Sequence, residues 1–322
     1  MDSVNMGSSA VINNPEKSRY ASVRRKKNLF FFLMALPFLI VVAVFYLYVN
    51  ISSFAMAFLE YELVERVGDV STFVWFKNFS TVLNIIFSPE EVSMIGFSFL
   101  MYAFVLCFIT PVVIFFSFYI YKNFLLSSFF RVVLFMPQIV SSVVYVTLYK
   151  TMLGPIYMQL SGAEIGLLYG DTTNIMLSLI FFVFWTGFGT NILLMSGAMS
   201  AIDNSIVEAC YLDGCNMTKE FIHVTLPSIY PTITTFIVLD LTTLFTNTMH
   251  LYTFFDAGAP VKSVGYYIEV NTMNSPGLVH SNKLPWLTYP ELSALGFLIT
   301  IIVTPVTLTV RRLLEKFGPS ED

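Results

Sequence analysis

The chain has 322 residues, of which 56% are hydrophobic and 12% are charged, and its mean hydropathy is +0.73. A soluble domain carries about 25% charged residues, so half that proportion excludes an ordinary water-soluble protein and indicates that lipid is the solvent for much of the chain. The 33 phenylalanines suit such an environment. The net charge of −4 says little about partners, and we expect no nucleic acid among them.

Long apolar stretches dominate the chain. A membrane-spanning helix needs about 20 mostly apolar residues. The first stretch follows the basic cluster Arg24-Arg25-Lys26-Lys27. It is not a signal peptide, because it is too long and no small-residue cleavage site follows it. The sequence therefore predicts an all-α, polytopic membrane protein with about six transmembrane helices, over 28–50, 95–121, 129–150, 173–199, 222–249 and 291–312.

The basic residues predict the orientation of these spans. With six spans and the amino end inside, twelve of the 17 Lys and Arg residues lie on the cytoplasmic side, as the positive-inside rule requires. The other five are Arg66, Lys77, Lys150, Lys262 and Lys283. We therefore expect a protein of the cell membrane with both termini in the cytoplasm. It would consist of a tail over 1–27, a transmembrane domain over 28–313 and a second tail over 314–322.

The segment between the fourth and fifth spans is polar, and this topology places it in the cytoplasm. Ser205 and Glu208 have the spacing of a capping box, so we expect a short helix that runs to about Asp213. Gly214 then fits the left-handed position that ends a helix. A second helix should begin near Thr218.

Two prolines follow. Pro227 and Pro231 each remove a backbone donor, so the fifth span should begin kinked. From geometry alone, the whole segment could equally be a well-capped helix–turn–helix that only joins two spans.

The residues of this segment match a known pattern. Glu208-Ala209-Cys210-Tyr211-Leu212-Asp213-Gly214, followed after a gap by Phe221-Ile222-His223-Val224-Thr225-Leu226-Pro227 and Pro231, resembles the EAA loop of ABC-importer permeases, in the carbohydrate branch of that family. The resemblance implies the type I ABC importer permease fold and a coupling loop over about 200–221 that seats on an ATPase subunit. The implied ATPase-coupling residues are Glu208, Ala209, Asp213, Gly214 and Pro227.

Further implications concern the loop's packing and the rest of the chain. In the family, the glycine at the position of Gly214 lets the two helices approach closely, and Cys210 and Cys215 replace more usual small residues. Weaker matches occur at 37–39, 75–79, 130–137 and 255–260, and Arg311-Arg312 closes the last span.

The resemblance also implies a function and a set of partners. The chain would be half of a heterodimeric pore for ATP-dependent import of a carbohydrate, expected to be an oligosaccharide. Its partners would be a second permease subunit, a dimer of cytoplasmic ATP-binding subunits and an extracellular solute-binding protein. The sequence has no G-x-x-x-x-G-K-[ST] motif, so we expect no nucleotide site, catalytic residue or cofactor in the chain itself.

Three alternatives stay open at this point. An ABC permease could carry a non-sugar solute such as a glycerol phosphate. A secondary transporter would need an ion-coupling site and often an inverted repeat, and the chain has no evident internal repeat. A membrane-embedded enzyme would need a cluster of catalytic groups at one depth.

One acidic residue stands inside a predicted span. Asp240 lies in the fifth, and an acid at that depth normally faces protein or water. Thr243, Asn247 and His250 follow at helical spacing, so we expect a polar stripe that could line a solute path. Packing between helices explains such a stripe equally well. Asn191 in the fourth span is a weaker pathway candidate.

The cysteines predict neither a bridge nor a metal site. Three cysteines in so long a chain give no disulfide framework. The spacing of Cys210, Cys215 and His223 is not that of a usual zinc site.

Overall fold

A computed structural model describes residues 15–64, 68–89, 91–161, 168, 171–279 and 286–319. Most of the predicted tail over 1–27, the end of the second tail, and Arg66 and Lys283 of the orientation argument lie outside the described residues. The chain divides into two compact units, Met1–Ala55 and Met56–Asp322, and each is described by itself.

The first unit is a long apolar helix. It comprises α1 (Pro15–Val41), the π-helical turn η1 (Val42–Tyr48) and α2 (Val49–Met56). The stretch Arg24–Met56 is long and apolar enough to cross a membrane. The predicted first span over 28–50 lies within it.

Three further continuous helices could cross a membrane. The first consists of α4 (Val92–Phe104), η2 (Val105–Ile109) and α5 (Thr110–Tyr121). The second consists of α8 (Thr172–Thr186) and α9 (Gly189–Ser200), and the third is α16 (Tyr289–Phe317). They correspond to the predicted second, fourth and sixth spans. Within the second unit, α5 packs along α9, and α13 (Tyr230–Thr242) packs along α16.

The remaining two predicted spans are bent pairs of helices. The helix over Met217–Ser228 turns by 62° into α13, as the two prolines predicted. The third span was predicted as one helix over 129–150, and this is wrong. Instead α6 (Ser127–Ile139) ends where Val140 adopts an extended backbone, and α7 (Ser142–Ser161) leaves at 106°. The described residues contain six spans when each bent pair counts as one.

The mostly helical chain also contains a hairpin that the all-α prediction missed. Strands β1 (Leu59–Val64) and β2 (Gly68–Phe73) pair antiparallel, with Leu59 opposite Phe73, and α3 (Lys77–Ile86) follows. The alternation of apolar and polar residues over 59–63 is the period of a strand and could have indicated it.

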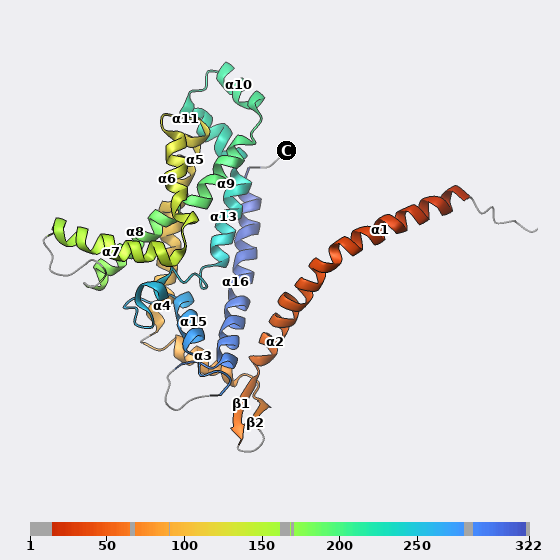
Figure 1. Ribbon diagram of the computed structural model, residues 1–322. Coiled ribbons are helices and arrows are strands. Elements are labelled where there is room, and N and C mark those ends of the chain that lie inside the picture. The colour runs from red at the N-terminus through yellow and green to blue at the C-terminus, as the bar shows by residue number, and fades with distance from the viewer. Residues whose placement is uncertain are drawn as a thin grey trace, which may run out of the picture. The chain divides into compact units, whose positions relative to one another are not determined.

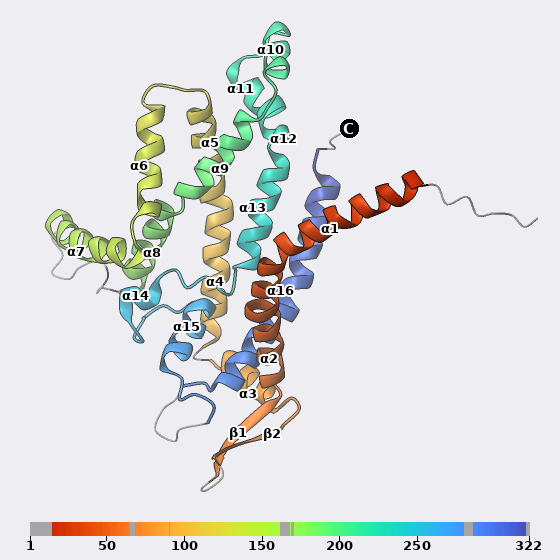
Figure 2. The ribbon, with the colours of Figure 1, turned by 45° about the vertical axis from the view of Figure 1, so that its right-hand side comes forward.

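The short helix α14 (Leu251–Phe255) packs against α7, and most of the other short elements lie at the two ends of the second unit. Near one end are α10 (Asn204–Leu212), α11 (Met217–Glu220), η3 (Phe221–Thr225) and the connection between α5 and α6 (Figure 1). At the opposite end are the hairpin, α3 and α15 (Val264–Asn274), as Figure 2 also shows. A buried cluster of side chains from α5, α9 and α13 connects the first end to the middle of the unit: Ile114, Phe118, Ile192, Met195 and Ile233.

Candidate functional site

The loop between α9 and α13 begins with a capped helix. The Asp203 carboxylate accepts a hydrogen bond from the Ser205 amide at 2.9 Å, and α10 starts at Asn204. The predicted capping box of Ser205 and Glu208 is therefore wrong, because Ser205 is already inside the helix and the acid before the helix takes the cap position. This hydrogen bond, accepted by the charged carboxylate, holds the pKa of Asp203 below its usual value.

Gly214 ends this helix as predicted. Its φ is +79°, in the left-handed region that a side chain disfavours. A Cβ built at Gly214 would meet no atom within 4 Å. The backbone conformation therefore requires the glycine. The resemblance implied that the close approach of two helices requires it, but among the described residues no neighbouring helix lies that close. Asn216 then caps α11 by accepting from the Lys219 amide at 2.9 Å.

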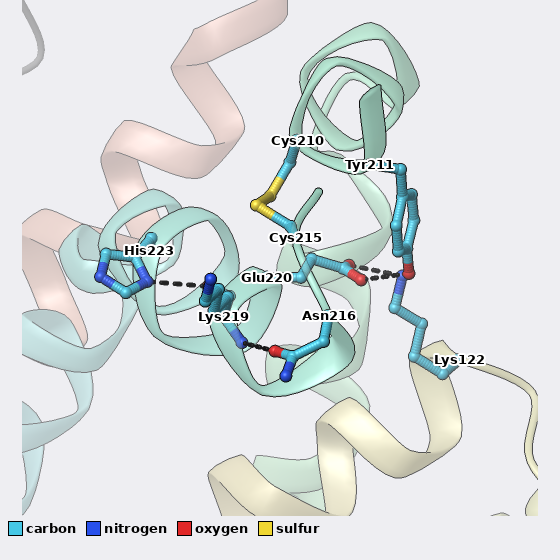
Figure 3. Close-up of a disulfide and its surroundings, with 8 residues drawn as sticks. All are labelled: Lys122, Cys210, Tyr211, Cys215, Asn216, Lys219, Glu220 and His223. Carbon is cyan, nitrogen blue, oxygen red and sulfur yellow. Dashed lines mark hydrogen bonds and ion pairs between the residues drawn. A yellow bond between two sulfur atoms is a disulfide. The ribbon is translucent and has the colours of Figure 1, made fainter. Parts of the chain in front are cut away.

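A disulfide joins α10 to the turn that precedes α11 (Figure 3). Cys210 in α10 and Cys215 after the turn are bonded, with their Cα atoms 5.3 Å apart. The expectation that the cysteines form no bridge is wrong for this pair, because the turn at Gly214 brings residues five apart in sequence into bonding distance. His223 Nδ1 instead lies 3.0 Å from the carbonyl oxygen of Lys219.

The tip of the loop is exposed. Glu208, Ala209, Asp213 and Gly214 are all exposed, and Pro227 is half-buried beyond η3. Leu212, which the sequence pattern did not single out, is 88% exposed at the end of α10. Ile206, Tyr211 and Met217 of the same loop are exposed as well, and a group of exposed apolar side chains suits a surface that is covered by another protein.

The polar stripe of the fifth span has a different shape from the one predicted. Helix α13 ends at Thr242, so Thr243, Asn247 and His250 do not continue it and the predicted helical spacing is wrong. The Thr243 hydroxyl donates to the carbonyl of Asp240 at 3.0 Å. Asn247 accepts from the Met249 amide at 2.9 Å, and His250 has a left-handed φ of +57°. One helix-type bond remains, from the Asn247 amide to the Thr243 carbonyl at 2.8 Å, and the side-chain bonds to nearby backbone groups accompany the end of the regular helix.

Three of the four stripe residues nevertheless meet. Asp240, Thr243 and Asn247 line one cavity of about 40 Å³ together with Tyr102 of α4, which the sequence analysis missed. His250 does not join them and instead lies 2.8 Å from the hydroxyl of Tyr145. The cavity has room for water but is far below the roughly 300 Å³ of a small-molecule pocket.

Asn191 does not belong to this group. Its amide lies 3.5 Å from the carbonyl of Gly187 in the preceding turn of the chain. The structure therefore brings together Asp240, Thr243 and Asn247 and leaves Asn191 and His250 apart from that cavity.

Comparison with known proteins supports one family. Residues 109–320 match the model of the family described as binding-protein-dependent transport system inner membrane component. The arabinooligosaccharides transport system permease protein AraP of Bacillus subtilis (strain 168) is 24% identical over 305 residues, which cover 89% of this chain and 88% of that protein. The probable ABC transporter permease protein YurN of the same organism is 33% identical over 129 residues, 37% of this chain and 44% of that protein.

Solved structures agree on the fold. A chain of a bacterial ABC transporter involved in the import of the acidic polysaccharide alginate matches 94% of this chain and 100% of its own length, with a TM-score of 0.69 and 16% identity. A chain of the bacterial alginate transporter in complex with a pentasaccharide-bound periplasmic protein matches with a TM-score of 0.66.

Proposed function

Because the chain belongs to the family of inner membrane components of binding-protein-dependent transport systems, we propose that it forms half of the pore of an ATP-dependent oligosaccharide importer. As the permease component of an ABC importer, it spans the inner membrane several times and is not the ATPase subunit. This membership leaves no support for the secondary transporter or the membrane-embedded enzyme.

The main support for an oligosaccharide as the substrate is the likeness to AraP, which extends over most of both chains. The cavity at Asp240 adds a second, chemical argument. Among the described residues that line it, none is basic and one is acidic. A glycerol phosphate or an acidic sugar chain would find no basic partner there, whereas the hydroxyls of a neutral sugar would find hydrogen-bond acceptors and donors. We therefore favour a neutral oligosaccharide.

The exposed loop from Asp203 to Asn216 is the proposed seat on the ATPase. In this proposal the loop lies in the cytoplasm, and closure of an ATP-binding dimer moves it against the spans. A second permease subunit completes the pore, and an extracellular solute-binding protein delivers the sugar. The solute passes Asp240, Thr243 and Asn247, and the cavity widens in another state of the cycle, because at its present size it admits no sugar ring.

Purification and uptake together test this proposal. A tagged chain expressed from its own chromosomal locus should copurify a second permease and a protein with a P-loop, both identified by mass spectrometry. Cells with and without the gene should then be given labelled neutral arabino-oligosaccharides, alginate oligosaccharides or glycerol 3-phosphate. We expect gene-dependent uptake of the neutral sugar alone. Gene-dependent uptake of glycerol 3-phosphate alone would refute the carbohydrate assignment, and copurification without a P-loop protein would refute the importer role.

A further inference from the structure

Three side chains from distant parts of the chain meet beneath the exposed loop. Lys122 lies directly after α5, Tyr211 lies in α10 and Glu220 is the last residue of α11 (Figure 3). The Lys122 ammonium forms an ion pair with one carboxylate oxygen of Glu220. The Tyr211 hydroxyl donates to the other oxygen at 2.5 Å. Both helices of the loop are thus tied through one carboxylate to the end of a membrane span.

This ion pair is shielded from water. The side chain of Glu220 is 0% exposed and that of Lys122 is 15% exposed. The Lys122 ammonium lies 5.0 Å from the ring centre of Tyr121 and 5.7 Å from that of Tyr211, within the range of cation–π attraction. Phe118 of α5 adds a third ring at 5.9 Å. Low local dielectric and little screening make the geometry of such a pair stiff.

Both partners of Glu220 hold their protons at neutral pH. Burial lowers the pKa of Lys122, but the hydrogen bond and the charge of Glu220 raise it by more, so its pKa lies above the usual value. The hydrogen bond to Glu220 raises the pKa of the Tyr211 phenol. Lys122 is therefore a cation and Tyr211 a neutral donor in the same state of the protein.

The other contacts between this loop and the spans are mainly apolar, including that of Phe221 with Phe118 of α5, whose ring centres lie 4.8 Å apart. In α10 only Val207 and Cys210 are buried, and the bond between Cys210 and Cys215 stays within the loop. Apolar contacts can slide, whereas a buried ion pair with a hydrogen bond to each side has one favoured arrangement. Lys122 also continues a span that packs along α9, so a pull on Glu220 acts on α5 directly.

We propose that Lys122, Glu220 and Tyr211 form the joint that makes the α10–α11 loop and α5 move as one body when the ATPase acts. This inference rests on the proposed function of the loop and names the residues that pass its movement to the pore. All three are positioning residues and touch no nucleotide or solute.

Spin-label distances in the assembled complex test the joint. The chain carries nitroxides at two exposed positions, Asn204→Cys at the start of α10 and Leu125→Cys after α5, with Cys107, Cys210 and Cys215 replaced by Ser. The complex is purified with its copurifying subunits and placed in lipid nanodiscs. The distance between labels is measured without nucleotide and after trapping with ATP and vanadate. We expect the same narrow distribution in both states.

Variants of the joint should separate the two labels on trapping. In Glu220→Gln and Lys122→Met, trapping should shift or broaden the distance while ATP hydrolysis continues. Tyr211→Phe keeps the ion pair and the fold but removes one hydrogen bond to Glu220. After trapping, the ratio of complexes with the resting distance to complexes with a changed distance should therefore fall about tenfold. The exchange Lys122→Glu with Glu220→Lys should restore the narrow distribution. Lys219→Met, an exposed lysine on the same helix, is the matched control and should change nothing.

The outcomes separate this inference from the proposed function. A wild-type complex without a vanadate-trapped ATPase would overturn the coupling role and the joint with it. A trapped complex in which Tyr211→Phe and Glu220→Gln keep the resting distance would overturn the joint alone. Should Lys122→Met or Glu220→Gln fail to assemble, Tyr211→Phe decides, because it removes only one hydroxyl group.

Discussion

Gly214 offers the sharpest test of the loop, because its replacement acts through the backbone alone. At φ +79° an L-residue pays for a left-handed conformation, and no neighbouring atom within 4 Å adds a steric term. The left-handed conformation costs about 1–2 kcal/mol for a residue with a Cβ, and a β-branched side chain lies at the upper end. Asn tolerates this region better than other non-glycine residues, so Gly214→Asn should be mild.

The cost converts directly into affinity if the turn must keep its shape to seat on the ATPase. A penalty of about 1–2 kcal/mol weakens binding by about five- to thirtyfold. We therefore expect Gly214→Val to lower the affinity of the permease for the ATP-binding subunit by that factor, with Gly214→Asn close to wild type. The measurement is a titration of the purified ATP-binding subunit onto the permease in nanodiscs, in the presence of reductant.

Gly197 supplies the matched control. It also has no atom within 4 Å of a built Cβ, but it lies inside α9 at an ordinary helical φ. Gly197→Val should therefore leave the affinity unchanged, because valine fits that backbone. Wild-type affinity and transport in Gly214→Val would refute the assignment of this turn as the coupling element. Equal losses in both variants would refute the argument from backbone strain.

Three further outcomes are expected. After reduction, and with Cys107→Ser, Cys210 and Cys215 should label with a membrane-impermeant thiol reagent in inverted vesicles and not in intact cells; labelling from outside would contradict the cytoplasmic loop. Uptake per assembled complex should fall in Asp240→Leu and change less in Asp240→Asn, which keeps the shape, whereas an unchanged rate in Asp240→Leu would make this a packing residue. Asn78→Ala removes the hydrogen bonds that the Asn78 side-chain amide donates to the carbonyls of Ala57 and Leu59. It should lower the unfolding free energy by about 1–3 kcal/mol, measured by thermal unfolding in detergent with Ser80→Ala as the control.

The sequence was most informative where structure is set by near neighbours. The spans follow from apolar length, the left-handed turn at Gly214 from the lack of a side chain, and the bend before α13 from Pro227 and Pro231. In each case the residues that determine the structure lie within a short stretch of the chain, so a pattern in one sequence identifies them. The prediction of the helix cap was wrong although the cap is also set by near neighbours. Asp203 and Ser205 are both good capping residues, and the helix is capped by Asp203.

Other features depend on contacts that no local pattern contains. The break at Val140 lies beside Gln138, whose amide donates to the carbonyl of Thr186 at 2.8 Å, far along the chain. The turns after Thr242 end a helix that apolar length alone would continue. Tyr102 reaches the Asp240 cavity from α4, so only the packed fold places it there. Polar residues inside apolar stretches are therefore identified as candidates by sequence, but their grouping is not.

The proposed coupling loop combines both kinds of determinant, and this division has a mechanical meaning in the proposed function. Its shape is local: the Asp203 cap, the turn at Gly214 and the Asn216 cap lie within 14 consecutive positions and fix a surface that another protein can bind. Its attachment is non-local: Glu220 reaches Lys122 at the end of a different span. If the loop seats on the ATPase as proposed, its surface must match a partner, and its local pattern is then the part that can be recognised from sequence. The attachment needs only to be stiff, so different chemistry can provide it, and here a buried ion pair does so.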